Sequence, residues 1–314
     1  MAVTVVGSIA FDAVKTPFGE RERMLGGAAV HFALAASFFD EVRVVGPVGD
    51  DFGEAELEVM RRRGVDVSDI EHVPGGETFF WAGEYGWDLN SRETLETRLG
   101  VFEHFEPKLS EAARSSEVLF LANIQPDLQR AVREQCTGAR FAALDSMNLW
   151  IDIARDSLLA TIATVDCLVL NNEELRQLTS MPNTVRAARE VLSWGPPGPS
   201  VIIAKQGEYG AAMITKDSFF ALPAFPLEDV VDPTGAGDTF AGGFMGFIAA
   251  AADGELDEPL LRRAMAYGTA LASFNVEEFG TERVARLTAP EISGRVAALA
   301  SVTHFSDAPV ALRG

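Results

Sequence analysis

Short runs of consecutive apolar residues, each about as long as a buried strand, recur along the chain and are mostly separated by segments with helical periodicity. These runs are Val3–Val6, Val42–Val45, Val118–Ala122, Phe141–Leu144, Leu168–Leu170, Val201–Ala204 and Ala211–Ile214. They are continuous rather than alternating, which is typical of strands covered by helices on both faces. The pattern therefore predicts an α/β fold built on a largely parallel sheet.

Two segments have a different pattern. The segment Thr78–Phe105 mixes aromatic and polar residues without a clean helical face, so we expect a small β excursion or lid there, or alternatively an edge hairpin without a function. The segment Phe52–Arg63 places apolar residues among charged ones and ends in three arginines before Gly64, which predicts a surface helix.

Composition and charge narrow the classes of function. The chain has 314 residues, 47% of them hydrophobic, which is an ordinary globular composition. Its 46 acidic and 26 basic residues give a net charge of -20, so nucleic acid and anionic membranes would be repelled and are not expected partners. Cys136 and Cys167 have no metal-type spacing, and we expect both to be buried. No apolar stretch reaches the roughly 18 residues of a membrane helix, and the N-terminus lacks signal-peptide features, so we expect a cytoplasmic protein.

The most informative segment is Asp232–Phe240, with the sequence DPTGAGDTF, followed by the apolar run AGGFMGFIAAAA. Pro233 favours a turn, the glycines let a ligand approach the backbone closely, and the apolar run predicts a helix. The first N–H groups of a helix lack partners within it and lie at the positive end of its dipole, so this turn can bind an anion such as a phosphoryl group. The donors are the backbone N–H groups of Gly235, Ala236, Gly237 and Asp238.

Asp238 would place a carboxylate beside this anion site, within reach of a hydroxyl aligned for attack on phosphorus. A general base of this kind accelerates a reaction by about 10² to 10⁴. The local sequence leaves an alternative open, in which Asp238 is a helix cap and the glycines form an ordinary tight turn.

The wider sequence resembles the ribokinase, or PfkB-type, carbohydrate kinase family. The DPTGAGDTF motif and the Gly-rich apolar helix after it are similar to the family's C-terminal signature, and further similar segments follow one another in the family's order. These are GSIAFD, the pair Gly26–Gly27, VGPVGDDFG, RRRGVD, LNNEEL, AKQGEYGA and ASFNVEEFG. The resemblance implies a single domain over residues 1–314, a three-layer α/β/α sandwich with a mostly parallel central sheet. It also implies a small β lid built from about residues 13–25 and 77–103.

The resemblance also implies roles for individual residues. Asp238 would be the catalytic base, with the backbone of Gly235, Ala236 and Gly237 as the anion hole. Asp12 would hold two adjacent hydroxyls of a ring substrate, although by its local sequence it could simply be a turn residue. The substrate-binding residues would be Asp12, Gly26, Gly27, His31 and Asn123.

A second group of positions would bind ATP and ions. Asn171 and Glu174 match an NxxE pattern that organises Mg²⁺ through water, and they equally match a helix-capping pair; both readings can hold together. The nucleotide would be contacted by Lys205, Gly207, Gly210 and Asn275. A monovalent cation such as K⁺ is permitted by the resemblance, with ligands at Asp232 and Thr234 and at backbone carbonyls near Asn275, Glu278 and Gly280.

The sequence departs from the family pattern near the substrate. His31 stands where the family usually has asparagine, which we interpret as a change of specificity, and the segment Asp145–Trp150 lacks an arginine that many sugar kinases carry. The change at His31 argues against ribose itself, and the missing arginine leaves open how that wall of the site is built. The expected lid carries the aromatic residues Phe79, Phe80, Trp81, Tyr85 and Trp87. They could stack on a nucleobase, or pack the lid onto the body or onto a partner subunit in a homodimer.

We therefore predict an ATP-dependent kinase that transfers the γ-phosphoryl group to a primary hydroxyl of a small ring substrate, a sugar or a nucleoside. The first alternative is a catalytically inactive nucleotide-binding sensor of the same fold. A dinucleotide-dependent oxidoreductase is disfavoured, because no GxGxxG follows the first apolar run, and no P-loop sequence is present either.

Overall fold

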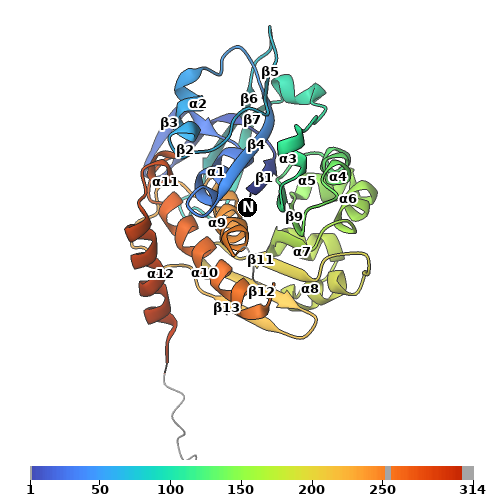
Figure 1. The fold of residues 1–314 in the computed structure, drawn as a ribbon. Helices are drawn as coiled ribbons and strands as arrows, with labels where there is room; N and C mark the ends of the chain where they lie inside the picture. Colours follow the sequence, from blue (N-terminus) through green and yellow to red (C-terminus); the bar gives the residue numbers. More distant parts are fainter. Residues whose placement is uncertain (1, 252–255, 306–314) are drawn as a thin grey trace, which may run out of the picture.

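The computed structural model describes residues 2–251 and 256–305, and within this part of the chain nine strands form one large sheet (Figure 1). Their order is β13-β12-β11-β10-β9-β8-β1-β4-β5. The strands are β1 (Ala2–Val6), β4 (Glu41–Val48), β5 (Ile70–His72), β8 (Val118–Leu121), β9 (Phe141–Asp145), β10 (Cys167–Asn171), β11 (Val201–Lys205), β12 (Ala211–Thr215) and β13 (Phe219–Leu222). Neighbouring strands are parallel except for the β11–β12 and β12–β13 pairs at one edge. All seven apolar runs are strands of this sheet, as predicted.

Helices cover both faces of the sheet, and alternate residues of each strand supply the two cores. Val118 and Phe120 of β8 belong to a cluster that includes buried residues of the helices α1 and α9, whereas Leu119 and Leu121 face the helices α4, α6, α7 and α8. A strand buried on both faces has no polar side, which explains the continuous apolar runs. The three-layer α/β/α architecture is confirmed.

The helices of the described residues fall on the two faces and the rim of the sheet. They are α1 (Ala28–Ala36), α2 (Glu54–Arg61), α3 (Glu111–Arg114), α4 (Pro126–Gln135), α5 (Asn148–Ile153), α6 (Arg155–Ile162), α7 (Asn172–Thr179), α8 (Thr184–Leu192), α9 (Ala236–Ala250), α10 (Glu258–Asn275), α11 (Glu282–Ala285) and α12 (Ala289–Thr303), with the short 3₁₀ helices η1 (Gly100–His104) and η2 (Gly207–Tyr209). The predicted surface helix is α2, and Gly64 follows it with a φ of 74°. Among the described helices, none combines the length and apolar character needed to cross a membrane.

A second, smaller sheet lies over the upper part of the molecule in Figure 1, with the strand order β3-β2-β6-β7. Its strands are β2 (Ala10–Thr16), β3 (Gly19–Gly26), β6 (Phe79–Tyr85) and β7 (Arg92–Arg98). The strand-like pattern of Thr78–Phe105 thus corresponds to β6, β7 and the turn η1. All seven residues of β7 are exposed at the edge of this sheet. We call these four strands the lid sheet.

Glycines of α9 allow three helices to pack at very short distances. A Cβ atom at Gly242 would lie 2.2 Å from the carbonyl oxygen of Phe32 in α1, and one at Gly243 would lie 2.9 Å from the Cα atom of Gly268 in α10. The close contact therefore requires glycine at both positions.

Candidate active site

The site is organised around the turn that precedes α9. Gly235 has a φ of 75° and is the N-cap residue, and among the described residues no side chain caps this helix. The N–H of Ala236 donates to the carbonyl of Pro233 at 3.3 Å. The predicted junction of turn and helix is therefore present, with first-turn donors that no side chain occupies, as an anion site requires.

Asp238 is the third residue of α9, and its side chain is partly buried. Loss of solvation and, after it, the nearby charge of Asp145 together raise the pKa of Asp238 to about 7, against the opposing effects of Lys205, a backbone hydrogen bond and Arg92. A carboxylate with a pKa close to neutrality can both accept and hold a proton under physiological conditions.

Lys205 and Asp145 form a buried ion pair beside the first turn of α9. The Nζ atom of Lys205 lies 2.8 Å from Oδ2 of Asp145, and a Cβ atom at Gly237 would lie 3.0 Å from the same nitrogen. Burial alone lowers the pKa of Lys205, but the negative charges of Asp145, Glu174 and Asp238 raise it above its ordinary value. The lysine is therefore a cation held among carboxylates at the anion-binding turn.

Three neighbouring strands bring these groups together. Asp145 ends β9, Asn171 ends β10 and Lys205 ends β11, and the register pairs Asn171 with Lys205. The carboxyl ends of parallel strands meet at one edge of a sheet, where ligands bind in folds of this class. Asp145 lay inside a segment noted from the sequence but was not assigned a role there.

Asn171 and Glu174 form a capping box at the start of α7. Oδ1 of Asn171 accepts from the N–H groups of Glu173 and Glu174 at 2.9 and 2.8 Å, and Oε2 of Glu174 accepts from the N–H of Asn171 at 2.9 Å. Burial raises the pKa of Glu174 to about 7, Lys205 lowers it and Asp145 raises it. The pair caps a helix and also adds a second desolvated carboxylate near Lys205.

Asp12 lies against the glycine pair on the opposite side of the site. A Cβ atom at Gly26 would lie 1.9 Å from Oδ2 of Asp12, and Gly27, with a φ of 95°, begins α1 without a side-chain cap. Burial raises the pKa of Asp12 to about 7, and the charges of Asp232 and Asp238 contribute to this rise. Asp12 and Asp238 thus share one acidic site, although they are 226 positions apart in the sequence.

His31 and Asn275 lie beneath the turn, where both are buried. Nδ1 of His31 is 3.0 Å from Oδ1 of Asn275, and burial lowers the pKa of His31, so its ring is neutral. Asn123 lies at the end of β8, where its Oδ1 accepts from Nε1 of Trp150 at 3.0 Å. The structure brings these predicted residues to the region of the site, with side chains bonded to other protein groups.

The residues assigned to a monovalent cation are engaged with other protein groups. Asp232 accepts from the N–H groups of Thr234 and Gly280 at 2.9 and 3.0 Å, which ties the loop after α10 to the turn before α9. The hydroxyl of Thr234 donates to Tyr85 at 3.1 Å, and Glu278 pairs with Arg286.

A cavity of about 570 Å³ extends from this turn between the lid sheet and α10. Its lining includes Lys205, Gly207, Gly210 and Gly237, and the apolar residues Ala224, Phe225, Pro226, Leu227, Val230, Phe240, Ala272 and Val276. Thr269 and Ser273 also line it, as do Asp88, Leu89 and Asn90 of the loop between β6 and β7. Nδ2 of Asn90 donates to Oε1 of Glu208 at 3.2 Å, so the β6–β7 loop is bonded to the rim of the cavity. An apolar cavity that ends at an anion-binding turn can accommodate a nucleobase at one end and phosphates at the other.

The lid sheet contributes one cation to the site. The guanidinium of Arg92 lies over the ring of Trp81, and its charge lowers the pKa values of Asp12, Glu174 and Asp238. Sequence reasoning missed Arg92, because a lone arginine on a polar strand carries no motif.

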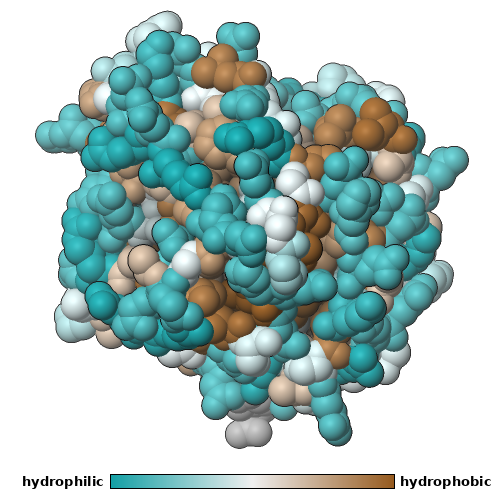
Figure 2. Space-filling model, turned by 90° about the horizontal axis from the view of Figure 1, so that it is seen from above, coloured by the Kyte–Doolittle hydropathy of each residue, from teal (hydrophilic) through white to brown (hydrophobic). Residues whose placement is uncertain are grey.

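The five aromatic residues of the lid sheet do not line the cavity described above. Phe79 packs against Phe102, Phe80 lies under Arg98, and the side chain of Trp87 is exposed. Tyr85 accepts the bond from Thr234. Phe80 and Trp81 thus contact arginines of the neighbouring lid strand, whereas Phe79 and Tyr85 connect the lid sheet to η1 and to the turn before α9. The homodimer expected through the lid stays a prediction. From above, the surface is mostly hydrophilic, with separate hydrophobic areas (Figure 2).

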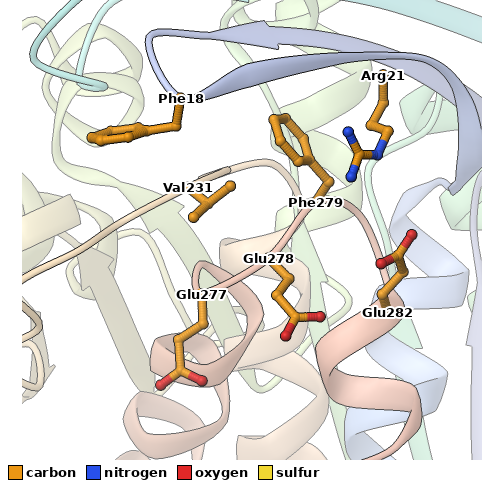
Figure 3. A pocket seen from close by; sticks show the side chains of 7 residues that line it. All are labelled: Phe18, Arg21, Val231, Glu277, Glu278, Phe279 and Glu282. Carbon is orange, nitrogen blue, oxygen red and sulfur yellow. The ribbon is translucent and has the colours of Figure 1, made fainter.

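A second cavity, of about 320 Å³, is lined by Phe18, Arg21, Val231, Glu277, Glu278, Phe279 and Glu282. Figure 3 shows Arg21 and the two rings on one side and the glutamates on the other. The guanidinium of Arg21 lies 4.7 Å from the centre of the Phe279 ring. Two of the three glutamates are already in ion pairs, Glu277 with Arg283 and Arg295 and Glu278 with Arg286.

Comparison with known proteins decides the family. The model of the pfkB family carbohydrate kinases matches residues 3–286. The chain belongs to the pfkB family. It is 28% identical to the cytidine kinase of Thermococcus kodakarensis over 77% of this chain and 87% of the relative. It is 26% identical to the nucleoside kinase of Methanothermobacter thermautotrophicus over 88% of this chain and 90% of the relative.

Solved structures show the same fold. The nucleoside kinase of Methanocaldococcus jannaschii, an archaeal member of the ribokinase family, has a TM-score of 0.76 at 20% identity and covers 95% of this chain and 98% of its own. The adenosine kinase of Sinorhizobium meliloti has a TM-score of 0.76 at 19% identity, with coverage of 94% and 98%. The ribokinase-like fold predicted from the sequence is confirmed, and this pfkB-family member is a phosphotransferase with an alcohol group as acceptor.

Proposed function

We propose that this pfkB-family protein is an ATP-dependent nucleoside kinase in which Asp238 removes the proton from a primary hydroxyl of the acceptor. The observation that carries this proposal is the position of Asp238, a desolvated carboxylate with a pKa of about 7 in the uncapped first turn of α9. An anion site and a base within one helical turn are what in-line transfer of a phosphoryl group requires.

The donor would occupy the cavity of about 570 Å³. Its apolar walls suit a nucleobase, while the first turn of α9 and the ammonium group of Lys205 suit the terminal phosphates. Gly207 and Gly210 line the same cavity, so backbone groups can approach the donor closely there.

Magnesium would be held near Glu174 through water and phosphate oxygens. Among the described residues no group of three or more His, Cys, Asp or Glu side chains is arranged to hold a metal ion directly, and Mg²⁺ characteristically keeps several of its waters. The carboxylates of Glu174, Asp145 and Asp238 outnumber the single cation Lys205 that lies among them, so added positive charge would be stabilised. When bound, Mg²⁺ supplies charge neutralisation of the phosphates. The side chains of Asp232 and Thr234, assigned to K⁺, already have protein partners, and we propose no step for that ion.

The acceptor would lie between Asp12 and Asp238. Asp12, beside Gly26 and Gly27, would accept hydrogen bonds from two ring hydroxyls and orient the ring. Asp238 would then accept the proton of the primary hydroxyl as its oxygen bonds to phosphorus and the bond to the leaving phosphate oxygen breaks. Arg92 of the lid sheet would offset the negative charge that gathers between these carboxylates.

A nucleoside is the preferred acceptor because the cytidine and nucleoside kinases described above are similar to this chain over most of its length. A free sugar is the second candidate. It is favoured by the packing of two lid aromatics that could stack on a base, since Phe79 contacts Phe102 and Phe80 contacts Arg98.

The test is ATP consumption by the purified protein with Mg²⁺ against a panel of nucleosides, pentoses and hexoses. Turnover with nucleosides is expected. Turnover restricted to free sugars would transfer the assignment to the second candidate. Absence of turnover with every acceptor, together with tight ATP binding, would overturn the proposal in favour of a nucleotide sensor. The presence of Asp12, Asp238, Glu174 and Lys205 around one site argues against that outcome.

A further inference from the structure

His31 and Asn275 are in contact beneath the turn that precedes α9. The role inferred for this pair rests on the proposed function. His31 belongs to α1 and Asn275 is the last residue of α10. Their contact joins two helices through residues that are 244 positions apart in the sequence. Their relative exposures are 2% and 0%. Most buried polar groups are hydrogen-bonded within the protein, so the bonds of this pair are informative.

The hydrogen bonds define the orientation of the Asn275 amide and the tautomer of His31. Nδ2 of Asn275 donates to the carbonyl of Thr234 at 2.7 Å, so Oδ1 is the acceptor on the other side. That oxygen accepts from the hydroxyl of Thr239 at 3.0 Å and lies 3.0 Å from Nδ1 of His31. Nδ1 of His31 must therefore carry the hydrogen, and the ring is the Nδ1–H tautomer.

The His31 ring also fills the space under Gly235. A Cβ atom at Gly235 would lie 2.4 to 2.5 Å from the atoms Cε1, Nδ1 and Cδ2 of the ring. Nε2 of the ring is buried and has no hydrogen-bond partner among the described residues. The ring is therefore suited to two tasks, donation from Nδ1 and support of the glycine above it.

We propose that His31 and Asn275 are positioning residues that hold the anion-binding turn and Asp238 in their working geometry. The bonds of Asn275 reach Thr234 and Thr239, which flank the four residues Gly235–Asp238 on both sides. His31 holds the acceptor oxygen of Asn275 and supports Gly235 from below. The pair acts through the turn, without contacting the substrate or the nucleotide.

Two substitutions of His31 separate donation from shape. In His31→Asn the amide nitrogen can occupy the place of Nδ1 and keep the donor, whereas His31→Phe keeps a ring and loses the donor. With MgATP and the best acceptor of the panel, we expect kcat of His31→Phe to fall roughly 10- to 100-fold, because small displacements of a catalytic geometry have effects of this size. The acceptor KM should stay within about threefold, since no contact with the acceptor is removed. His31→Asn should recover most of kcat.

A matched control distinguishes positioning from general destabilisation. Thr4→Val removes buried hydrogen bonds to Ala113 and Ser116, away from the catalytic turn, and should lower the melting temperature without lowering kcat. If His31→Phe does not fold, Thr239→Val removes the second donor to the same oxygen at nearly constant volume and should lower kcat in the same direction.

Either of two results would overturn the inference: wild-type kcat in His31→Phe and Thr239→Val, or an equal loss of kcat in His31→Asn and His31→Phe at equal melting temperature. MgATP affinity, measured by calorimetry on the same proteins, separates this inference from the proposed function. If the wild type turns over no acceptor, the proposed function fails. In that case an MgATP affinity that falls in His31→Phe and is retained in His31→Asn still supports the positioning role of His31 and Asn275. Unchanged MgATP affinity in both variants of such a protein would overturn the positioning role as well.

Discussion

The helices α9 and α12 each contain 15 residues and each carry an acidic residue at the third position. The pKa values of these two acids are shifted in opposite directions. Glu291 of α12 is on the surface and completes a capping box with Thr288, whose hydroxyl and N–H both donate to it. These bonds, with those from Arg283, lower the pKa of Glu291 to about 2. Asp238 of α9 follows a glycine N-cap, forms no capping box, and has its pKa raised to about 7 chiefly by burial.

The difference shows how one helical position can serve stability or chemistry. In α12 the carboxylate satisfies the donors of its own helix, so the free energy of that contact stabilises the fold. In α9 none of the described side chains caps the first turn and the carboxylate completes no capping box, although the N–H of Ala236 bonds to the carbonyl of Pro233. Leaving a helix start uncapped beside a buried carboxylate costs stability and leaves a reactive group. Glu174 of α7 is intermediate, since it completes a capping box but also has its pKa raised to about 7 by burial.

The largest expected effect comes from removing the free carboxylate. Asp238→Asn should lower kcat by about 10² to 10⁴ while ATP still binds, because the proton acceptor is lost and the turn is kept. Glu291→Gln, the same change at the same position of α12, should leave kcat unchanged. Steady-state kinetics on both variants test the comparison, and an Asp238→Asn variant with wild-type turnover would exclude this residue as the base. In the wild type, kcat/KM should fall as the pH drops below about 7, where Asp238 is protonated in the free enzyme.

The next effect concerns the glycine that opens α9. Gly235→Ala places a Cβ against the His31 ring at a φ of 75°, so strain and overpacking together should cost about 2–5 kcal/mol of stability, with loss of activity. Gly64→Ala is the matched control, because Gly64 has a φ of 74° and no atom within 4 Å of the added Cβ. It should cost only about 1–2 kcal/mol. Chemical denaturation measures both, and equal costs would show that the ring does not confine the turn.

The pH dependence of stability should have opposite signs for the two acids. The folded-state pKa of Asp238 lies above its unfolded value of 3.8, so the stability it contributes is full below pH 3.8 and is lost as the pH rises through about 7. Asp238→Asn should therefore raise the melting temperature at pH 8 and have little effect near pH 4. The folded-state pKa of Glu291 is about 2, below its unfolded value of 4.5. Glu291 therefore contributes its full stability above pH 4.5, and this stability is lost as the pH falls through about 2. Glu291→Gln should thus lower the melting temperature at pH 7, and the same sign for both variants at neutral pH would contradict the contrast.

The smallest effect should come from two N-cap asparagines. Asn171 caps α7 at the site and Asn183 caps α8 on the surface, and each side chain accepts backbone hydrogen bonds. Replacing either with alanine should cost about 1 kcal/mol of stability. Asn171→Ala should additionally raise the Mg²⁺ concentration needed for half-maximal activity, because it releases one side of the Glu174 capping box. An unchanged Mg²⁺ requirement would assign Asn171 to capping alone.

Local sequence patterns predict many of the secondary-structure elements of this protein. The seven apolar runs, the surface helix before Gly64 and the glycine turn that opens α9 lie where the sequence predicts them. Each depends on contacts or backbone preferences within a few residues or on the side-chain period of one element. The capping alternative at Asn171 and Glu174 was visible for the same reason.

The contacts between charged or buried residues of the site could not be predicted from local sequence patterns. Asp145 and Lys205 are 60 positions apart, and the pairing of His31 with Asn275 spans 244. Arg92 reaches the acidic groups only because the lid sheet folds over them. Such pairings follow from strand order and helix packing, which local periodicity does not encode.

By itself, the sequence determined the layers of the fold, the anion-binding turn and the residue types available for phosphoryl transfer, because these depend on short-range pattern and composition. Only the tertiary structure decided that Asp238 is a desolvated acid while Glu291, at the same helical position, is a solvated cap. A pKa depends on which distant groups exclude water and which charges they bring, and those groups meet only when the chain is folded.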